Sequence, residues 1–491
     1  MRGLRPVFCV MPVLLFALLP AANAHVGSPD IYLQGNAGPY PIYVSIHPPI
    51  VVPGVAEIFV HTDATDVNSI QVTPLLLSGE SSKHPRTPDA LDHNAAMPTE
   101  FHGNVWITSS GSWQVRFQVS GARGAGTIAI PVPSVASNVR GITFRLGVLI
   151  VVALMLLVAG LVGILGAAVR MASLPADVPA NALQRSRGRI ALAVSCVLLI
   201  LLLFAAGHWW NARAASYGNN VYKPLLMQAT LNSSGTLDLR LTDPGWLTTH
   251  RMDDLVPDHN HLMHLYMVRQ SQMDVIFHLH PQQIAPGDFQ LQLPSMPPGA
   301  YMLFADVVHA DGFPETAIAS LGLPPQTGRV LQGDDAMGVL PALDRATYTA
   351  NSLTLADGYT MLFDRPANIP ARTGQLLRFA LLDSNGKPPA DMADYMGMAG
   401  HAAILEDDFS VYAHIHPEGS VSMAAYMMAN AGRAATSNAI PAMDMSTMQS
   451  AAVPNTVSFP YGFPKAGRYR IFVQMKHGNT IETGAFDVVV N

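Results

Sequence analysis

Two long apolar runs constrain the fold of this chain more than any other feature. The first covers residues 146–169 and contains no charged side chain, and the second covers 190–210 with His208 as its one basic residue. Each run is at least as long as the about 20 residues that a helix needs to cross a bilayer. We therefore predict two transmembrane helices, which makes the lipid bilayer a predicted partner.

The segment between the two runs, residues 170–189, is short and basic. Its one acidic residue is Asp177, and its basic residues are Arg170, Arg185, Arg187 and Arg189. Short loops rich in arginine and lysine stay on the cytoplasmic side of a membrane. We therefore predict that 170–189 is a cytoplasmic loop, which leaves the large flanks on both sides outside the cytoplasm.

Residues 1–24 have the pattern of a secretory signal peptide. Arg2 and Arg5 precede an apolar stretch over 7–19, and Ala22-Asn23-Ala24 matches a small-x-small cleavage site. Cleavage there would make His25 the first residue of the mature chain. The predicted location is the inner (cytoplasmic) membrane, with both large domains in the periplasm.

Composition excludes several classes of protein. Hydrophobic residues make up 49% and charged residues 13%, a composition that is too apolar for a disordered chain. The sequence also lacks the clusters of lysine and arginine that are typical of nucleic-acid-binding proteins. The two cysteines, Cys9 and Cys196, both lie in apolar segments. The exported parts therefore contain no disulfide, thiolate zinc site or iron–sulfur cluster. Any metal chemistry there must use histidine, methionine and carboxylates.

The exported parts predict a mainly β fold. Short alternating segments such as 42–46, 56–60 and 113–119 are separated by glycine and proline, which is typical of a small antiparallel sandwich. We predict three immunoglobulin-like β-sandwich domains plus a two-helix transmembrane hairpin. The predicted domains cover 25–140, 222–330 and 346–491.

The last two domains are predicted to be copies of one repeat. Asp254 and His264 are ten residues apart, as are Asp391 and His401. Both copies continue with a His-x-His-Pro motif and a Tyr-to-His segment, and the second copy carries a Met/Ala-rich insertion at about 420–455. Matched spacing of this kind indicates an internal repeat.

Histidines at matched positions of the two copies are the strongest candidates for a site. In the second copy a turn at 406–409 would place His401 opposite His414, with His416 on the same face. In the first copy a turn at 270–273 would do the same, so we predict one patch, and one metal ion, in each copy. Three imidazoles suit copper, zinc or nickel, and the third strand could add a fourth ligand. The candidates are His264, His278, His280 and His309 in the first copy and His401, His414, His416 and His477 in the second.

Further donors lie outside these patches. Asp258-His259-Asn260-His261 adds two imidazoles in the first copy only. A free α-amine and imidazole at His25 could chelate copper together with a second histidine. The thioethers of Met443, Met445 and Met448 are soft ligands of the kind that selects Cu(I), and Met396 and Met398 form a second pair.

The repeat resembles YtkA-like domains. The shared pattern is Asp391, Tyr-Met-Gly at 395–397, Gly-His401, Tyr-Ala-His-Ile-His-Pro417, Gly-x-Tyr469 and Gln-x-x-His477. This resemblance implies small exported immunoglobulin-like sandwiches associated with heavy-metal handling. The mature start, His25-Val-Gly-Ser-Pro-Asp30, resembles CopC-like copper-resistance proteins, although no Asp-x-His stands near the end of residues 25–134.

These patterns favour a binding protein over an enzyme, because no nucleophile, P-loop or HExxH motif is present. We predict copper buffering, resistance or delivery, with Cu(II) at the histidine patches, Cu(I) at the methionine loop, and a metal exporter or metalloenzyme as partner. One alternative is an envelope binding or assembly module whose histidines are structural. The other is a copper oxidase that uses His25.

Overall fold

A computed structural model describes most of the chain, and its fold is mainly β with two long apolar helices. The described residues are 30–80, 86–93, 97–139, 142–172, 174–175, 178–246, 252–343, 349–431 and 452–491. The predicted signal peptide and His25 lie outside them. So do Met443, Met445 and Met448.

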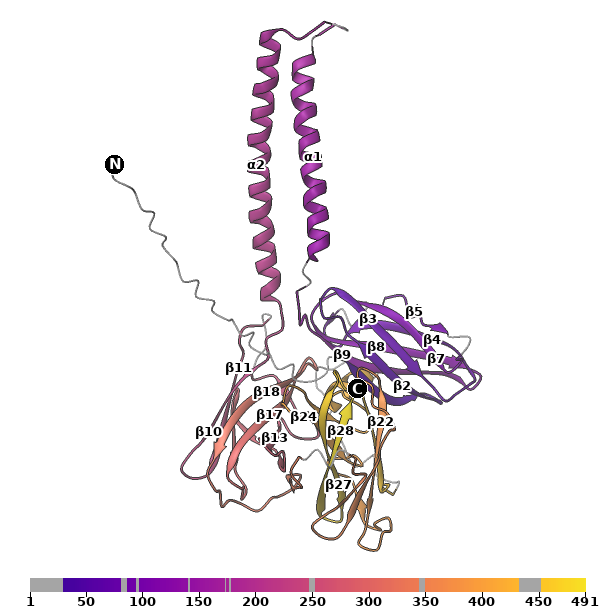
Figure 1. The fold of residues 1–491 in the computed structure, drawn as a ribbon. Coiled ribbons are helices and arrows are strands. Elements are labelled where there is room, and N and C mark those ends of the chain that lie inside the picture. Colours follow the sequence, from indigo (N-terminus) through magenta and orange to yellow (C-terminus); the bar gives the residue numbers. More distant parts are fainter. Residues whose placement is uncertain are drawn as a thin grey trace, which may run out of the picture.

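The two helices, α1 (Phe144–Met171) and α2 (Ala182–Asn219), run side by side away from the β-rich units (Figure 1). Both are long and apolar enough to cross a membrane. Glycines let them approach closely, since a Cβ on Gly188 would lie 3.0 Å from the Cβ of Arg170 and 3.2 Å from the carbonyl oxygen of Gly166.

Both helices are longer than the apolar runs that predicted them. Asn181 and Gln184 form a capping box, so α2 begins within the segment that we predicted to be a loop. At its other end α2 extends beyond residue 210 to Tyr217, whose hydroxyl donates to the carbonyl of Val52 at 2.8 Å. Helical propensity and capping therefore carry α2 past both ends of its apolar run.

The N-terminal unit consists of two sheets around one apolar core. The first sheet has the order β1-β2-β3-β7-β6 and the second β5-β4-β8-β9. The strands are β1 (Ile31–Ala37), β2 (Tyr40–His47), β3 (Gly54–His61), β4 (Val67–Leu76), β5 (Asp89–Ala90), β6 (Asp92–His93), β7 (Glu100–Ile107), β8 (Gly111–Gly121) and β9 (Gly124–Ser134).

The first repeat and its connection to the second contain ten strands in one continuous sheet. They are β10 (Leu226–Leu231), β11 (Thr236–Thr242), β12 (Leu255–Val256), β13 (His264–Arg269), β14 (Val275–Leu279), β15 (Gln282–Ala285), β16 (Asp288–Gln292), β17 (Gly299–His309), β18 (Pro314–Leu323) and β19 (Ala336–Val339).

The second repeat has two sheets and one short helix. Its elements are β20 (Ser352–Thr354), β21 (Thr360–Asp364), β22 (Gln375–Leu382), β23 (Met392–Ala393), β24 (His401–Glu406), β25 (Tyr412–Ile415), α3 (Met423–Ala431), β26 (Thr456–Tyr461), β27 (Gly467–His477) and β28 (Thr480–Val490).

The strands that carry the histidines pair in the same way in both repeats. In the first repeat β17 pairs with β12, β13 and β18, and β13 also pairs with β14. In the second repeat β27 pairs with β23, β24 and β28, and β24 also pairs with β25. Equivalent histidines therefore start from equivalent places in the two copies.

The two repeats pack against each other through a shared apolar cluster. Tyr266 and Phe304 of the first repeat join Leu405, Tyr412 and Phe472 of the second in one buried core. Helix α3 fills the space toward the N-terminal unit, where the side chain of Asn430 hydrogen-bonds both the backbone amide and the carbonyl of Ala129. The histidine-bearing edges of the two sheets are thereby held together.

Candidate metal centre

Eight histidines from both repeats form one cluster where the repeats meet. Each ring lies within 6.5 Å, centroid to centroid, of others in the set. The structure thus brings the two predicted patches into a single site at the interface. Its members are His259, His261, His264, His278 and His280 of the first repeat and His401, His414 and His416 of the second.

The hairpin register differs from the prediction in the second repeat. His414 pairs with Ala403 rather than with His401, because residues 406–411 form a longer connection in which Phe409 has a positive φ of 60°. A shift of two residues keeps a side chain on the same face of a strand. His401, at the start of β24, therefore still shares a face with His414.

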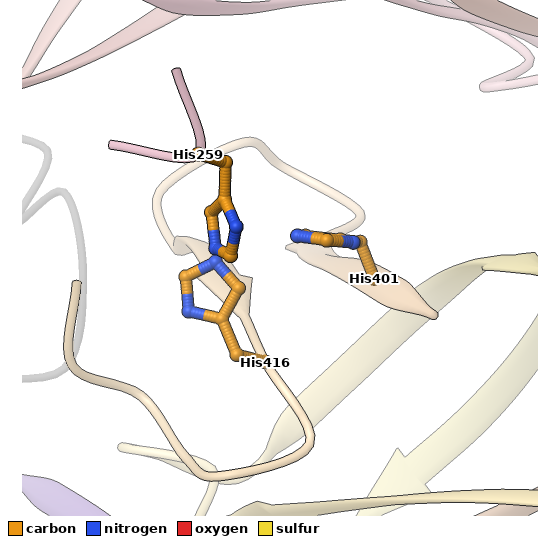
Figure 2. Close-up of side chains that lie close together, drawn as sticks. All are labelled: His259, His401 and His416. Atoms are coloured by element: carbon orange, nitrogen blue, oxygen red, sulfur yellow. The ribbon is translucent and has the colours of Figure 1, made fainter. Parts of the chain in front are cut away.

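One group of three imidazoles combines both repeats. The ligand atoms of His259, His401 and His416 all lie within 4.8 Å of one another, and Figure 2 shows the three rings pointing toward a common space. His259 donates through Nδ1 to the carbonyl of Met396 at 2.8 Å, and His416 donates through Nδ1 to that of Val421 at 3.1 Å. These bonds leave Nε2 of both rings as lone-pair donors toward the common space.

A second group of three belongs wholly to the first repeat, and each ring is again held by its other nitrogen. His264 donates through Nε2 to the carbonyl of Asp258 at 3.0 Å. His278 lies 3.0 Å from Oε1 of Gln474 through Nδ1, and His280 lies 3.1 Å from Oδ1 of Asp335 through Nδ1. Such outer partners are what fix the tautomer of metal-binding histidines.

The inner nitrogens of this second group face one another. Nδ1 of His264 lies 3.1 Å from Nε2 of His278, and both carry lone pairs once the outer nitrogens donate. Two facing lone pairs repel unless a proton or a cation lies between them. The three inner nitrogens, including Nε2 of His280, lie within 4.8 Å of one another, as ligands of one ion would.

Several buried ring nitrogens have no hydrogen-bond partner among the described residues. A buried polar atom without a partner costs roughly 1–3 kcal/mol, so several in one place call for a ligand. They are Nε2 of His259, His280, His414 and His416 and both nitrogens of His401.

The outer partners cross between the repeats. Gln474 of the second repeat contacts His278 of the first, and the hydroxyl of Tyr395 lies 3.1 Å from the same Nδ1 while donating to the carbonyl of Asp334. Sequence reasoning missed these residues as supports, although Gln474 and Tyr395 stand in the sequence pattern that prompted the comparison with YtkA-like domains. Their spacing from the histidines was the available signal.

Equivalent turns of the two repeats carry different donors. Residues 258–261 and 395–398 each close a turn with a bridge between their ends. Each turn ends three residues before the histidine that begins the hairpin of its repeat, His264 or His401. His259 and His261 of the first turn therefore correspond to Met396 and Met398 of the second. Both His259 and Met396 have positive φ, 48° and 52°, an uncommon conformation that tends to occur at functional sites.

His309 and His477, which we predicted as fourth ligands, are engaged by carboxylates at the far ends of β17 and β27. His309 lies 2.7 Å from Asp254 and 3.0 Å from Glu315. Burial alone would lower the pKa of His309, but the hydrogen bonds to these two carboxylates outweigh it and raise the pKa. His477 lies 3.4 Å from Glu482 and 3.5 Å from Asp391. Both residues end their strands, β17 and β27, beyond the part of each strand that pairs with the hairpin.

Burial keeps most cluster imidazoles neutral. It is the largest cause of a lowered pKa in His259, His264, His278, His280, His401 and His416, and neighbouring imidazoles lower the pKa of each further. Neutral imidazole is the form that binds metals.

Metal-free protein is therefore expected to lose stability in acid. The folded-state pKa values lie below the unfolded value of about 6.5, so the unfolded chain binds more protons below that pH. The stabilisation is complete above about pH 6.5 and is lost as the pH falls. Thermal unfolding of chelator-treated full-length protein in detergent should show a lower midpoint at about pH 5 than at about pH 7.5. An equal or higher midpoint in acid would contradict this assignment of neutral rings.

Comparisons with known proteins give one family match, over slightly less than half of the chain, and no established activity. Residues 223–320 and 354–491 match a family described as a domain of unknown function (DUF8832). No curated protein matches this chain. The family match covers both repeats, including every histidine of the cluster.

Solved structures give only distant similarity. A tetra-tandem repeat from the extending region of a large adhesion protein is 10% identical, covering 90% of this chain and 71% of its own, with a TM-score of 0.16. Salmonella alpha-2-macroglobulin reacted with methylamine is 7% identical, covering 94% and 23%, with a TM-score of 0.20. Dimeric latent PorU from Porphyromonas gingivalis is 8% identical, covering 94% and 34%, with a TM-score of 0.15.

Proposed function

We propose that this protein is a membrane-anchored metal-binding protein of the bacterial envelope that holds copper at the interface between its two repeats. The observation that carries this proposal is the set of buried ring nitrogens in the cluster that have no hydrogen-bond partners among the described residues. On each of these rings except that of His401, the other nitrogen already contacts a polar atom. Nitrogen lone pairs that converge on one space suit a cation, whereas an apolar ligand would leave them unpaired.

Copper is the metal that the donor set favours. All the inner donors are imidazoles, which suit copper, zinc, nickel and iron, and Cu²⁺ binds most tightly of the divalent first-row ions. Met396 and Met398 stand in the second repeat where His259 and His261 stand in the first. Thioethers close to imidazoles add affinity for Cu(I). Buffering, resistance or delivery to an exporter or metalloenzyme would each use such a site.

The membrane topology of the proposal rests on charge. The arginine-rich connection between α1 and α2 favours the cytoplasmic side, which would put the β-rich units in the periplasm. The two sheets of the N-terminal unit, with one core between them, support an immunoglobulin-like sandwich, as does the paired arrangement of strands in each repeat. A cytoplasm-dependent reporter fused after Asn491 should stay inactive, and an active fusion would contradict this topology.

The function is tested by metal analysis of the full-length protein in detergent. We expect about two Cu(II) ions per chain, one for each group of three imidazoles. The double variant His401→Ala/His416→Ala should retain about one ion, and the exposed His102→Ala in the N-terminal unit should retain both. If the wild type binds no copper or zinc above the level of a variant lacking all eight histidines, the cluster is structural.

A further inference from the structure

The two groups of imidazoles lie against each other within one cluster. His259 of the first group is 6.1 Å from His264 of the second, and His401 is 6.5 Å from His278, centroid to centroid. These spacings are close to those within the groups, such as 5.4 Å between His264 and His278. Ions held by the two groups would therefore be neighbours rather than independent sites.

His414 lies between the groups. Its ring is 4.7 Å from His416 and 5.5 Å from His401 on one side, and 5.3 Å from His264 and 5.6 Å from His278 on the other. Its Nε2 is buried and has no hydrogen-bond partner among the described residues. Its Nδ1 lies 3.4 Å from Oδ2 of Asp306. Its inner nitrogen is thus available to either ion.

The inner donors of the two groups are all imidazole nitrogens, and no carboxylate is among them. The carboxylates nearby contact the rings from outside, Asp335 at His280, Asp334 at His261 and Asp306 at His414. Two divalent ions bound here would bring about four positive charges into a buried site with no anionic ligand. Buried charge is costly unless it is compensated, so the centre should take up an anion.

The cluster comes closest to the surface at His261 and His280. His261 stacks on His280 with ring centroids 3.8 Å apart, and its side chain is 26% exposed and bonded to Asp334. The second group reaches toward the surface only through His280, which is 9% exposed. At most 3% of the surface is exposed in each of the other five members of the two groups, His259, His264, His278, His401 and His416. A ligand entering past His261 would reach the second group first.

We propose that the two ion sites form one dinuclear copper centre, with His414 between them, that binds a small inorganic anion as a bridging ligand. Known two-metal sites hold their ions about 3.5–4 Å apart, a separation that one small anion can span. This inference rests on the proposed copper binding and adds to it the class of exogenous ligand.

The test uses the full-length protein in detergent, loaded with two equivalents of Cu(II), and azide as the probe. We expect azide to bind with a stoichiometry of one per two copper ions, seen as a new charge-transfer absorption. The electron paramagnetic resonance signal should fall well below two spins per chain on azide addition. The control His102→Ala should behave like the wild type.

Single-ion variants make the test specific. His416→Ala removes a ligand of the first group, and His280→Ala removes a ligand of the second group. If one of these variants fails to fold, the other still tests the proposal. Each should keep about one copper ion with a full, azide-insensitive spin. Two bound ions that keep two full spins, with or without one azide each, would overturn the dinuclear centre and leave copper binding intact. Failure to bind copper at all would overturn both.

Discussion

Replacing His259 in the first repeat by alanine is expected to remove the same copper ion as replacing His416 in the second. Both imidazoles belong to the group that His401 completes, and loss of even an outer partner of a metal ligand lowers affinity about 10–100-fold. Loss of a ligand itself should exceed the upper end of that range. Competition titration of the full-length protein with a copper chelator measures the change.

The losses of copper binding caused by the two substitutions should also be less than additive. If His259 and His416 hold one ion, the double variant His259→Ala/His416→Ala should lose little more than either single variant. The matched comparison is His259→Ala/His280→Ala, which touches both groups and should lose both ions. Additive losses for His259 and His416 would mean that each repeat holds its own ion, as we predicted from the sequence.

Arg470→Met is expected to destabilise the pair of repeats by about 3–5 kcal/mol, since it removes one partner of a buried ion pair. Arg470 is 2% exposed and forms two bonds to Asp487, at 2.6 and 2.8 Å. It also donates to the carbonyls of Met273 and Pro341, at 2.8 and 3.0 Å. Its loss would leave a buried carboxylate without its guanidinium and loosen the interface between the repeats.

Arg468 provides the control for this prediction. It lies two residues away on the same strand and pairs with Asp407 at 2.7 Å, but its side chain is 43% exposed. Exposed pairs contribute about 0.2–1 kcal/mol, so Arg468→Met should have a small effect. Urea unfolding followed by far-ultraviolet circular dichroism measures both variants. Equal effects would contradict the importance assigned to burial.

The sequence predicts local structural features well, but it does not predict how the two repeats pack against each other. The apolar runs of α1 and α2 and the alternating strands follow from composition and period, which act within one segment. The face shared by His401, His414 and His416 also follows, because the side-chain period of a strand is two. The length of the 406–411 connection did not follow, since the left-handed Phe409 is not a typical turn residue.

The joint cluster could not be predicted from spacing. Which faces of two domains meet depends on the packing of residues such as Tyr266 and Phe472, and no local pattern encodes that choice.

His309 and His477 lie apart from the hairpin groups for a local reason. They follow the strand partners of His264 and His401 by three residues, since Asp306 pairs with His264 and Gln474 pairs with His401. Their carboxylate partners Glu315 and Glu482 lie close in sequence, and His477 forms a separate group of possible metal ligands with Asp357 and Glu482.

The shared cluster also has a consequence for inheritance. After a segment is duplicated, one copy can usually accumulate substitutions, because the other copy still performs the original function. Here Gln474 of the second copy orients His278 of the first. His259 of the first copy in turn completes the group that contains His401 and His416 of the second. Neither copy is therefore redundant, and one copy cannot compensate for a deleterious substitution in the other. Loss of either copy would break at least one of the two groups, which ties the two halves together as a single heritable unit.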